Sequence, residues 1–95
     1  MLNNLSFQLP VLITKQGRRF VAYTPALDIS TSGKTKKDVQ KKFRELVNVF
    51  FEEIIEAHTA DEVLSELGWT KIQKRWNPPE VVSAESISVR TPVFA

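Results

Sequence analysis

The apolar residues of this sequence change their spacing near Ser32-Gly33, and this change limits the folds open to the chain. Before it, in residues 6–15, apolar side chains recur at every second position, as on a strand with one buried face. After it, they recur at intervals of three and four, which is the spacing of one face of a helix. The alternating set is Phe7, Leu9, Val11 and Ile13, and the helical set is Val39, Phe43, Leu46, Val47, Phe50 and Ile54. A sheet followed by a long helix is therefore expected, which is an α+β arrangement.

Three short strands are expected before the helix. Residues 6–15 form the first, and Pro10, which has no N–H, places this strand at an edge or makes it begin after the proline. Gln16-Gly17 predicts a tight turn, so residues 19–24 should pair with the first strand as a hairpin. Pro25 ends the second strand, and residues 27–31 leave room for a third strand of a few residues.

The long helix is predicted to begin at Thr35 and to end at His58. Thr35 can cap the first turn, and Asp38 three residues later completes a shortened capping box. In the second half, Val49, Phe51 and Ile55 widen the apolar stripe beyond what one sheet face covers. Two interpretations remain open: a second helix or the chain's own tail covers the extra side, or these residues form a subunit interface.

A second helix, a fourth strand and a fifth strand are expected after the long helix. Residues 59–67 form the helix, which Gly68 ends, and residues 69–76 form the fourth strand. Pro78-Pro79 breaks that strand, and residues 81–95 alternate again and predict a fifth. The predicted order is β-β-β-α-α-β-β, a mostly antiparallel sheet packed against one long helix.

Length and composition indicate one domain over residues 1–95. The chain has 95 residues, no cysteine and a formal net charge of +2, and 25% of its residues are charged. No apolar run approaches the ~20 residues of a membrane helix, and the first residues lack the pattern of a secretory signal. These features predict a cytoplasmic protein without a membrane partner and without a separate DNA-binding domain.

The sequence offers no set of residues for catalysis or metal binding. Its single histidine, His58, lies at the junction of the two helices, where a helix-end or packing role is far commoner than a role as a base. The first three strands supply only Asp28, which is too few carboxylates for two-metal nuclease chemistry. Zinc ligands and a glycine-rich phosphate loop are also missing. The expectation is a protein that is not an enzyme and binds no cofactor or metal.

The charges are unevenly placed along the predicted helices. Basic residues crowd the start of the long helix, whereas the stretch from Glu45 to Glu66 holds seven acids and no lysine or arginine. The candidate partner-docking acids are Glu45, Glu52, Glu53, Glu56 and Glu62, and the candidate polyanion patch is Lys36, Lys37, Lys41 and Arg44. One interpretation is a solvated surface that tolerates a small unfavourable interaction with the helix dipole. The other is a bipolar surface for a charged partner or an antiparallel neighbour.

A short stretch of the sequence resembles a known family. Two short segments and the amphipathic helix after them resemble the N-terminal domain of HicB-like antitoxins. The segments are Phe20-Val21-Ala22-Tyr23-Thr24-Pro25-Ala26-Leu27 and Thr31-Ser32-Gly33-Lys34-Thr35. The resemblance covers residues 18–56. Ala26 stands where the family usually has an acid, and Lys34 and Lys37 also replace acids.

The resemblance implies a reduced ribonuclease H-like fold without nuclease activity that neutralises a small, basic, RNA-cleaving toxin. The alternative, from another class, is a solitary domain that binds a small ligand, or binds nucleic acid weakly and without sequence specificity, through the basic patch.

We also expect a homo-oligomer, a dimer or higher, because a chain of this size gains buried apolar area by associating. The candidate interface residues are Phe51, Ile55, Ile87, Val89 and Val93. Whether the strand over residues 81–95 pairs within its own chain or with a neighbour is left open by the sequence.

Overall fold

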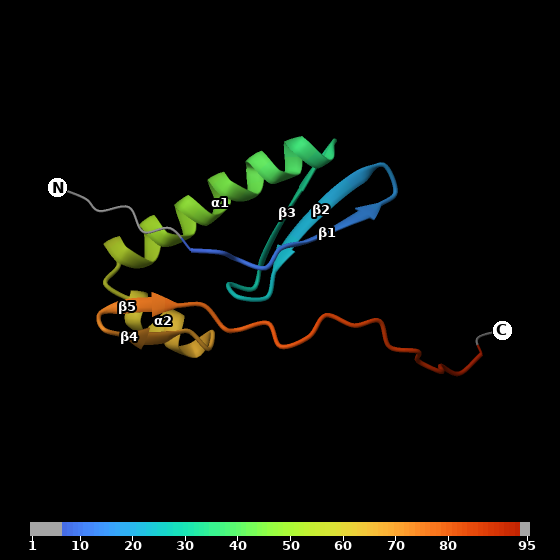
Figure 1. The fold of residues 1–95 in the computed structure, drawn as a ribbon. Coiled ribbons are helices and arrows are strands. Elements are labelled where there is room, and N and C mark those ends of the chain that lie inside the picture. The colour runs from blue at the N-terminus through green and yellow to red at the C-terminus, as the bar shows by residue number, and fades with distance from the viewer. Residues whose placement is uncertain (1–6, 94–95) are drawn as a thin grey trace.

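The computed structural model describes residues 7–93, and Figure 1 shows a long helix lying across a sheet, with a smaller helix and hairpin at one end. In chain order the elements are β1 (Leu12–Gln16), β2 (Arg19–Thr24), β3 (Ile29–Gly33), α1 (Lys36–Glu56), α2 (Ala60–Glu66), β4 (Thr70–Ile72) and β5 (Arg75–Asn77). This order confirms the predicted α+β layout. Ser6, where the first alternating segment begins, and residues 94–95 lie outside the described part of the chain.

The first three strands form an antiparallel sheet in the order β1-β2-β3. Gly17 opens the two-residue turn between β1 and β2 at φ +63°, which fits a hairpin turn that begins with glycine. The last pair of this ladder is Leu12 with Tyr23. Extending the register by two residues would set Pro10 against Pro25, and neither has an N–H, so the ladder ends before them.

Helix α1 packs on β2 and β3. Ala22, Val39 and Phe43 are buried between helix and sheet, and the helical spacing predicted this for Val39 and Phe43. Gly33 lets β3 and the helix start approach closely, because a Cβ at this position would lie 2.8 Å from the backbone nitrogen of Val39. The helix start therefore requires glycine here for steric reasons.

The two ends of α1 are closed by local hydrogen bonds. At the start, Asp38 N–H donates to Thr35 Oγ1 at 3.0 Å, and Lys34 N–H donates to Asp38 Oδ2 at 2.9 Å, which confirms the predicted capping residues. At the end, His58 adopts φ +57°, and the N–H groups of His58 and Thr59 donate to the carbonyls of Ile55 and Ile54. This is a Schellman motif with histidine at the position that glycine usually occupies, so His58 is a helix-end residue.

A second apolar cluster joins the remaining elements to the loop between β2 and β3. Its buried members are Ala26, Leu27, Ile54, Leu64 and Trp69. Trp69, only 3% exposed, donates its indole N–H to the backbone oxygen of Ala26 at 2.7 Å. This hydrogen bond joins positions 43 residues apart in the sequence and fixes the α2 region against the sheet end of the molecule.

The last two strands lie elsewhere than predicted. Residues 69–76 were expected to form one strand, but residues 70–77 form a hairpin whose turn residues Gln73 and Lys74 have φ of +52° and +65°. Both angles fit a type I′ turn, which usually carries asparagine or glycine, so Gln73 and Lys74 are not recognisable as turn residues from their types.

The predicted fifth strand is wrong for the described residues 81–93, which have no strand and extend away from the domain (Figure 1). Alternation specifies a face, but a strand also needs a partner for its backbone groups, and this chain supplies none there.

We predict that Trp69→Phe lowers the free energy of unfolding by about 1–3 kcal/mol. The substitution keeps an aromatic ring but leaves the buried Ala26 carbonyl without its donor. Urea unfolding followed by far-UV circular dichroism measures the effect.

Trp76→Phe is the matched control, since Trp76 is half-buried and lies over the Lys71 ammonium at 5.6 Å. Its loss should stay below about 1 kcal/mol. Equal losses for both variants would contradict a special role for the Trp69 hydrogen bond.

Candidate protein-interaction surface

An acidic stripe follows the solvent side of α1. Glu45, Glu52 and Glu56 lie seven and four positions apart, so they share one helix face, and all three are exposed. Val49, which is 47% exposed, lies on the same face between them. The stripe therefore combines negative charge with a small apolar contact point.

The remaining candidate acids, Glu53 and Glu62, are also exposed. Within residues 7–93 the ion pairs are Lys42 with Asp38 at 3.3 Å and Lys71 with Asp61 at 3.8 Å. None of the five candidate docking acids takes part in either pair. Their charges remain available to a basic partner.

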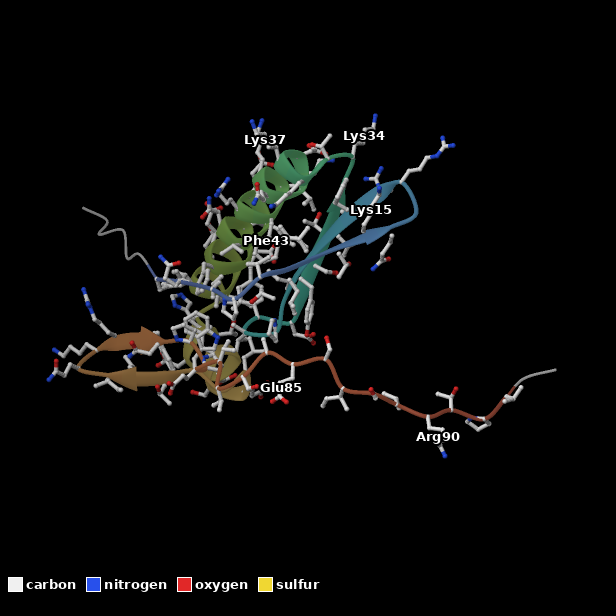
Figure 2. All side chains as sticks on the ribbon, turned by 45° about the vertical axis from the view of Figure 1, so that its right-hand side comes forward. Lys15, Lys34, Lys37, Phe43, Glu85 and Arg90 are labelled. Carbon is white, nitrogen blue, oxygen red and sulfur yellow. The ribbon has the colours of Figure 1, made fainter. Side chains whose placement is uncertain are left out.

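The basic patch lies at the other end of the same helix. Lys36, Lys37, Lys41 and Arg44 are all exposed, and Figure 2 shows Lys34 and Lys37 pointing away from the helix start. Helix α1 thus presents positive charge at its first turns and negative charge at its last turns, opposite to the order that the helix dipole favours. Of the candidate docking acids, Glu45 lies in the middle of α1, Glu52, Glu53 and Glu56 lie in its last turns, and Glu62 lies on α2.

The basic patch lacks a stacking surface for bases. Phe43, the aromatic residue between Lys42 and Arg44, is 5% exposed and belongs to the core. Contacts to nucleic acid from this patch would therefore be ionic contacts to phosphate rather than stacking.

An apolar groove lies between α1 and the edge of the sheet at β1. It consists of two adjoining hollows of about 320 and 660 Å³ that share Leu9, Val11, Phe43 and Arg44. Ile13 and Ala22 line the first hollow, and Phe7 and Val47 line the second. Gln8, Gln40 and Asn48 add polar groups to the lining. The groove exists because α1 packs mainly on β2 and β3 and covers the helix-facing side of β1 only in part, at Ile13.

The candidate interface residues of α1 differ in their surroundings. Phe51 is half-buried, with ring centroids 5.6 Å from Phe7 and 6.0 Å from Trp69. The chain's own aromatic residues therefore cover the side of the helix that carries Phe51. Ile55 is 61% exposed and keeps its apolar surface in solvent.

Residues 81–93 carry the other candidate interface residues. Ile87, Val89 and Val93 are 77%, 80% and 97% exposed. Their alternating side chains meet no surface of the described chain.

The two residues considered for catalysis, His58 and Asp28, lie apart, and each has a structural contact. His58 closes α1, while Asp28 accepts a hydrogen bond from the Tyr23 hydroxyl at 3.0 Å. That bond, together with the charge of Asp28, raises the pKa of Tyr23 above its ordinary value. Within residues 7–93, no three side chains of histidine, aspartate or glutamate converge in a way that could hold a metal ion. In the same part of the chain, no helix has the length and apolar character to cross a membrane.

The groove and the Trp69 anchor were missed by reasoning from the sequence. Tryptophan at the end of a short helix was a usable signal for the anchor, because a large aromatic with one N–H tends to be buried with a partner. The groove had no such signal, since it results from which strands α1 covers.

Comparisons of this chain with protein-family models, with curated proteins and with solved structures find no match. Nothing in them points to the HicB-like family. The fold and surface therefore define an α+β domain with a charged helix, and its function is a matter for proposal.

We predict that Asp38 makes the stability of the protein depend on pH in the acid range. The Lys34 N–H, followed by the Lys42 ammonium, holds the pKa of Asp38 below its ordinary value of 3.8. Because the folded pKa is the lower one, the stabilisation is complete above pH 3.8 and is lost as the pH falls through the folded value.

Thermal unfolding between about pH 5 and pH 2 should show a smaller decline for Asp38→Asn than for the parent protein. NMR titration of the Asp38 carboxyl carbon gives the folded pKa directly. Parallel pH profiles for the two proteins, with a carboxyl that titrates at its ordinary value, would contradict this role.

Proposed function

We propose that this chain is a non-catalytic protein-interaction module of the HicB-like antitoxin type, which neutralises a small basic RNA-cleaving toxin. The observation that carries the proposal is the exposed acidic stripe of Glu45, Glu52 and Glu56 on α1, which has no ion-pair partner within residues 7–93. A rigid helix packed on a sheet holds these carboxylates in a fixed array, which suits a basic partner.

The order of the elements also supports the proposal. Three antiparallel strands followed by one long helix agree with the start of the fold that the family resemblance implies. Gly33, Thr35 and Asp38, which carry part of that resemblance, form the tight start of α1. These residues support a shared local structure, and the acids supply the partner chemistry.

Electrostatic docking gives the proposal its first test. An antitoxin of this type should be encoded next to its small basic toxin. Charge reversal by Glu52→Lys with Glu56→Lys should slow association with a toxin found in the neighbouring reading frame by about tenfold or more at low salt. The rate should also become less sensitive to ionic strength. Biolayer interferometry measures the rates, and a ribonuclease assay of that protein measures its neutralisation.

The matched control reverses two acids on α2, Asp61→Lys with Glu66→Lys, which changes the net charge equally. Both residues are exposed and lie outside the candidate docking set. The control should keep most of the association rate. Equal slowing by both pairs would mean that net charge, and not the α1 stripe, governs the encounter; no binding by any variant would overturn the antitoxin proposal.

The basic patch favours a second candidate function, weak binding of nucleic acid without sequence specificity. Four exposed cations (Lys36, Lys37, Lys41 and Arg44) lie within two and a half turns of α1. Without exposed aromatics among them, binding would depend on the displacement of counterions from phosphates.

This second function predicts a steep salt dependence. If four phosphates are contacted, affinity for a single-stranded RNA should fall about 50-fold between about 50 and 200 mM salt, as measured by fluorescence anisotropy. Lys36→Ala with Lys41→Ala should flatten the slope, whereas Lys71→Ala with Lys74→Ala on the β4–β5 hairpin should not. Salt-insensitive or sequence-selective binding would contradict this mode of binding.

A further inference from the structure

The outer edge of β1 has backbone groups without a partner strand. β1 is the first strand of the β1-β2-β3 sheet, and no strand within residues 7–93 lies on its other side. In the two-residue turn, Gln16 and Arg19 form a hydrogen-bonded pair, and such pairs alternate along an antiparallel ladder. Lys15 and Ile13 therefore direct their N–H and C=O groups toward the open edge.

The same residues place their side chains on the face that α1 covers elsewhere. Ile13 pairs with buried Ala22, and it lines the apolar groove together with Val11 and Leu9. An added strand would pair with the open backbone groups of β1 and would place its apolar side chains in the groove beside them.

The opposite edge of the sheet is less suitable. By the same alternation, Ser30 and Ser32 direct their backbone groups outward from β3, and their side chains lie on the face away from α1. Helix α1 packs over β3 and covers its helix-facing side. An apolar strand would find a matching surface at β1.

Residues 81–93 have the properties of such a strand. Ile87, Val89 and Val93 alternate with polar or small residues and are at least 77% exposed. Figures 1 and 2 both show this segment extended and leaving the domain, with Glu85 and Arg90 along it. The segment starts at Pro78-Pro79, beside Leu9 and Pro10. Its 12 peptide steps from Val81 to Val93 can span about 40 Å, which is enough to reach a second molecule.

We propose that residues 85–91 of one copy add as an antiparallel strand to β1 of a second copy, and that the second copy returns the same strand. A reciprocal exchange gives a closed dimer with two-fold symmetry. This inference is independent of the proposed toxin binding, because it uses the β1 edge and not the acidic stripe of α1.

Side-chain chemistry fixes the register of the exchange. Ile87 opposite Ile13 and Val89 opposite Val11 place both apolar residues of the added strand over the groove. The same antiparallel alignment sets Glu85 opposite Lys15, a pair of opposite charges on exposed side chains. A parallel alignment with the apolar residues matched would place Thr91 opposite Lys15 and lose this charge pair.

The prolines of both strands agree with this register. In the added strand, residues 85, 87 and 89 direct their N–H groups to β1, so Pro92 falls at a position whose N–H would point to solvent. Pro10 lies two residues before Leu12, whose backbone groups face β2, so the nitrogen of Pro10 also faces away from the open edge. Neither proline removes a donor from the proposed ladder.

Engineered cysteines test the exchange and its register. The chain has no cysteine of its own, and hydrogen-bonded pairs have Cα atoms about 5.5 Å apart, within the range for a disulfide. Full-length Lys15→Cys with Glu85→Cys should therefore give a disulfide-linked dimer on a non-reducing gel. Lys15→Cys with Ser86→Cys is the control, because residue 86 faces the other side of the sheet, and it should remain mostly uncrosslinked. A disulfide within one chain, or equal crosslinking of both variants, would overturn the proposal.

Sedimentation velocity at about ten micromolar protein gives an independent readout. The parent should be a dimer. Ile87→Glu with Val89→Glu should raise the dissociation constant of the dimer at least tenfold and so favour the monomer. Both residues are exposed in the single chain, so the substitutions leave its core intact. Ser86→Glu with Ser88→Glu adds the same charge on the other face and should stay dimeric. A monomeric parent, or a dimer that all variants retain, would overturn the exchange.

Discussion

The hydrogen bond from Trp69 to the Ala26 carbonyl connects the two parts of this protein. One part is the β1-β2-β3 sheet under the first half of α1, and the other is the cluster around α2 and the β4–β5 hairpin. Trp69 reaches across them and donates to the loop that joins β2 to β3. Its position also fixes where the chain leaves the domain, because Pro78-Pro79 follows the hairpin that Trp69 anchors. The point beside Leu9 and Pro10 from which residues 81–93 leave the domain therefore depends on that anchor.

The sequence predicted the first half of the fold well because local signals there agree with the tertiary contacts. Alternation predicted the first strand, the apolar run at residues 20–23 predicted the second, Gly17 predicted the turn, and Thr35 with Asp38 predicted the helix start. It failed after Gly68, where tertiary packing decides. Gln73 and Lys74 form a turn that their residue types disfavour, and the pattern of Ile87, Val89 and Val93 specifies a face without naming a partner.

The candidate site also has a part that local sequence predicts and a part that tertiary packing decides. Charged residues on a regular helix can be placed from spacing alone, so the two patches of α1 were predictable from the sequence. The groove beside β1 was not, because it depends on how far α1 shifts toward β3 across the sheet. Gly33 contributes to that placement because it allows the start of α1 to lie against the end of β3.

The exposed segment over residues 81–93 has a consequence for mixtures of intact and cleaved chains. Extended, solvent-exposed backbone is a preferred substrate for proteases. In the proposed exchange, a chain cut near Glu80 would keep its β1 edge and accept a strand, but it would have none to return. The β1 edge of each cleaved molecule would then bind residues 85–91 of an intact molecule, and the reciprocal pair would not form. Limited proteolysis would thus act as a dose-dependent inhibitor of assembly, with an effect larger than the fraction of chains destroyed.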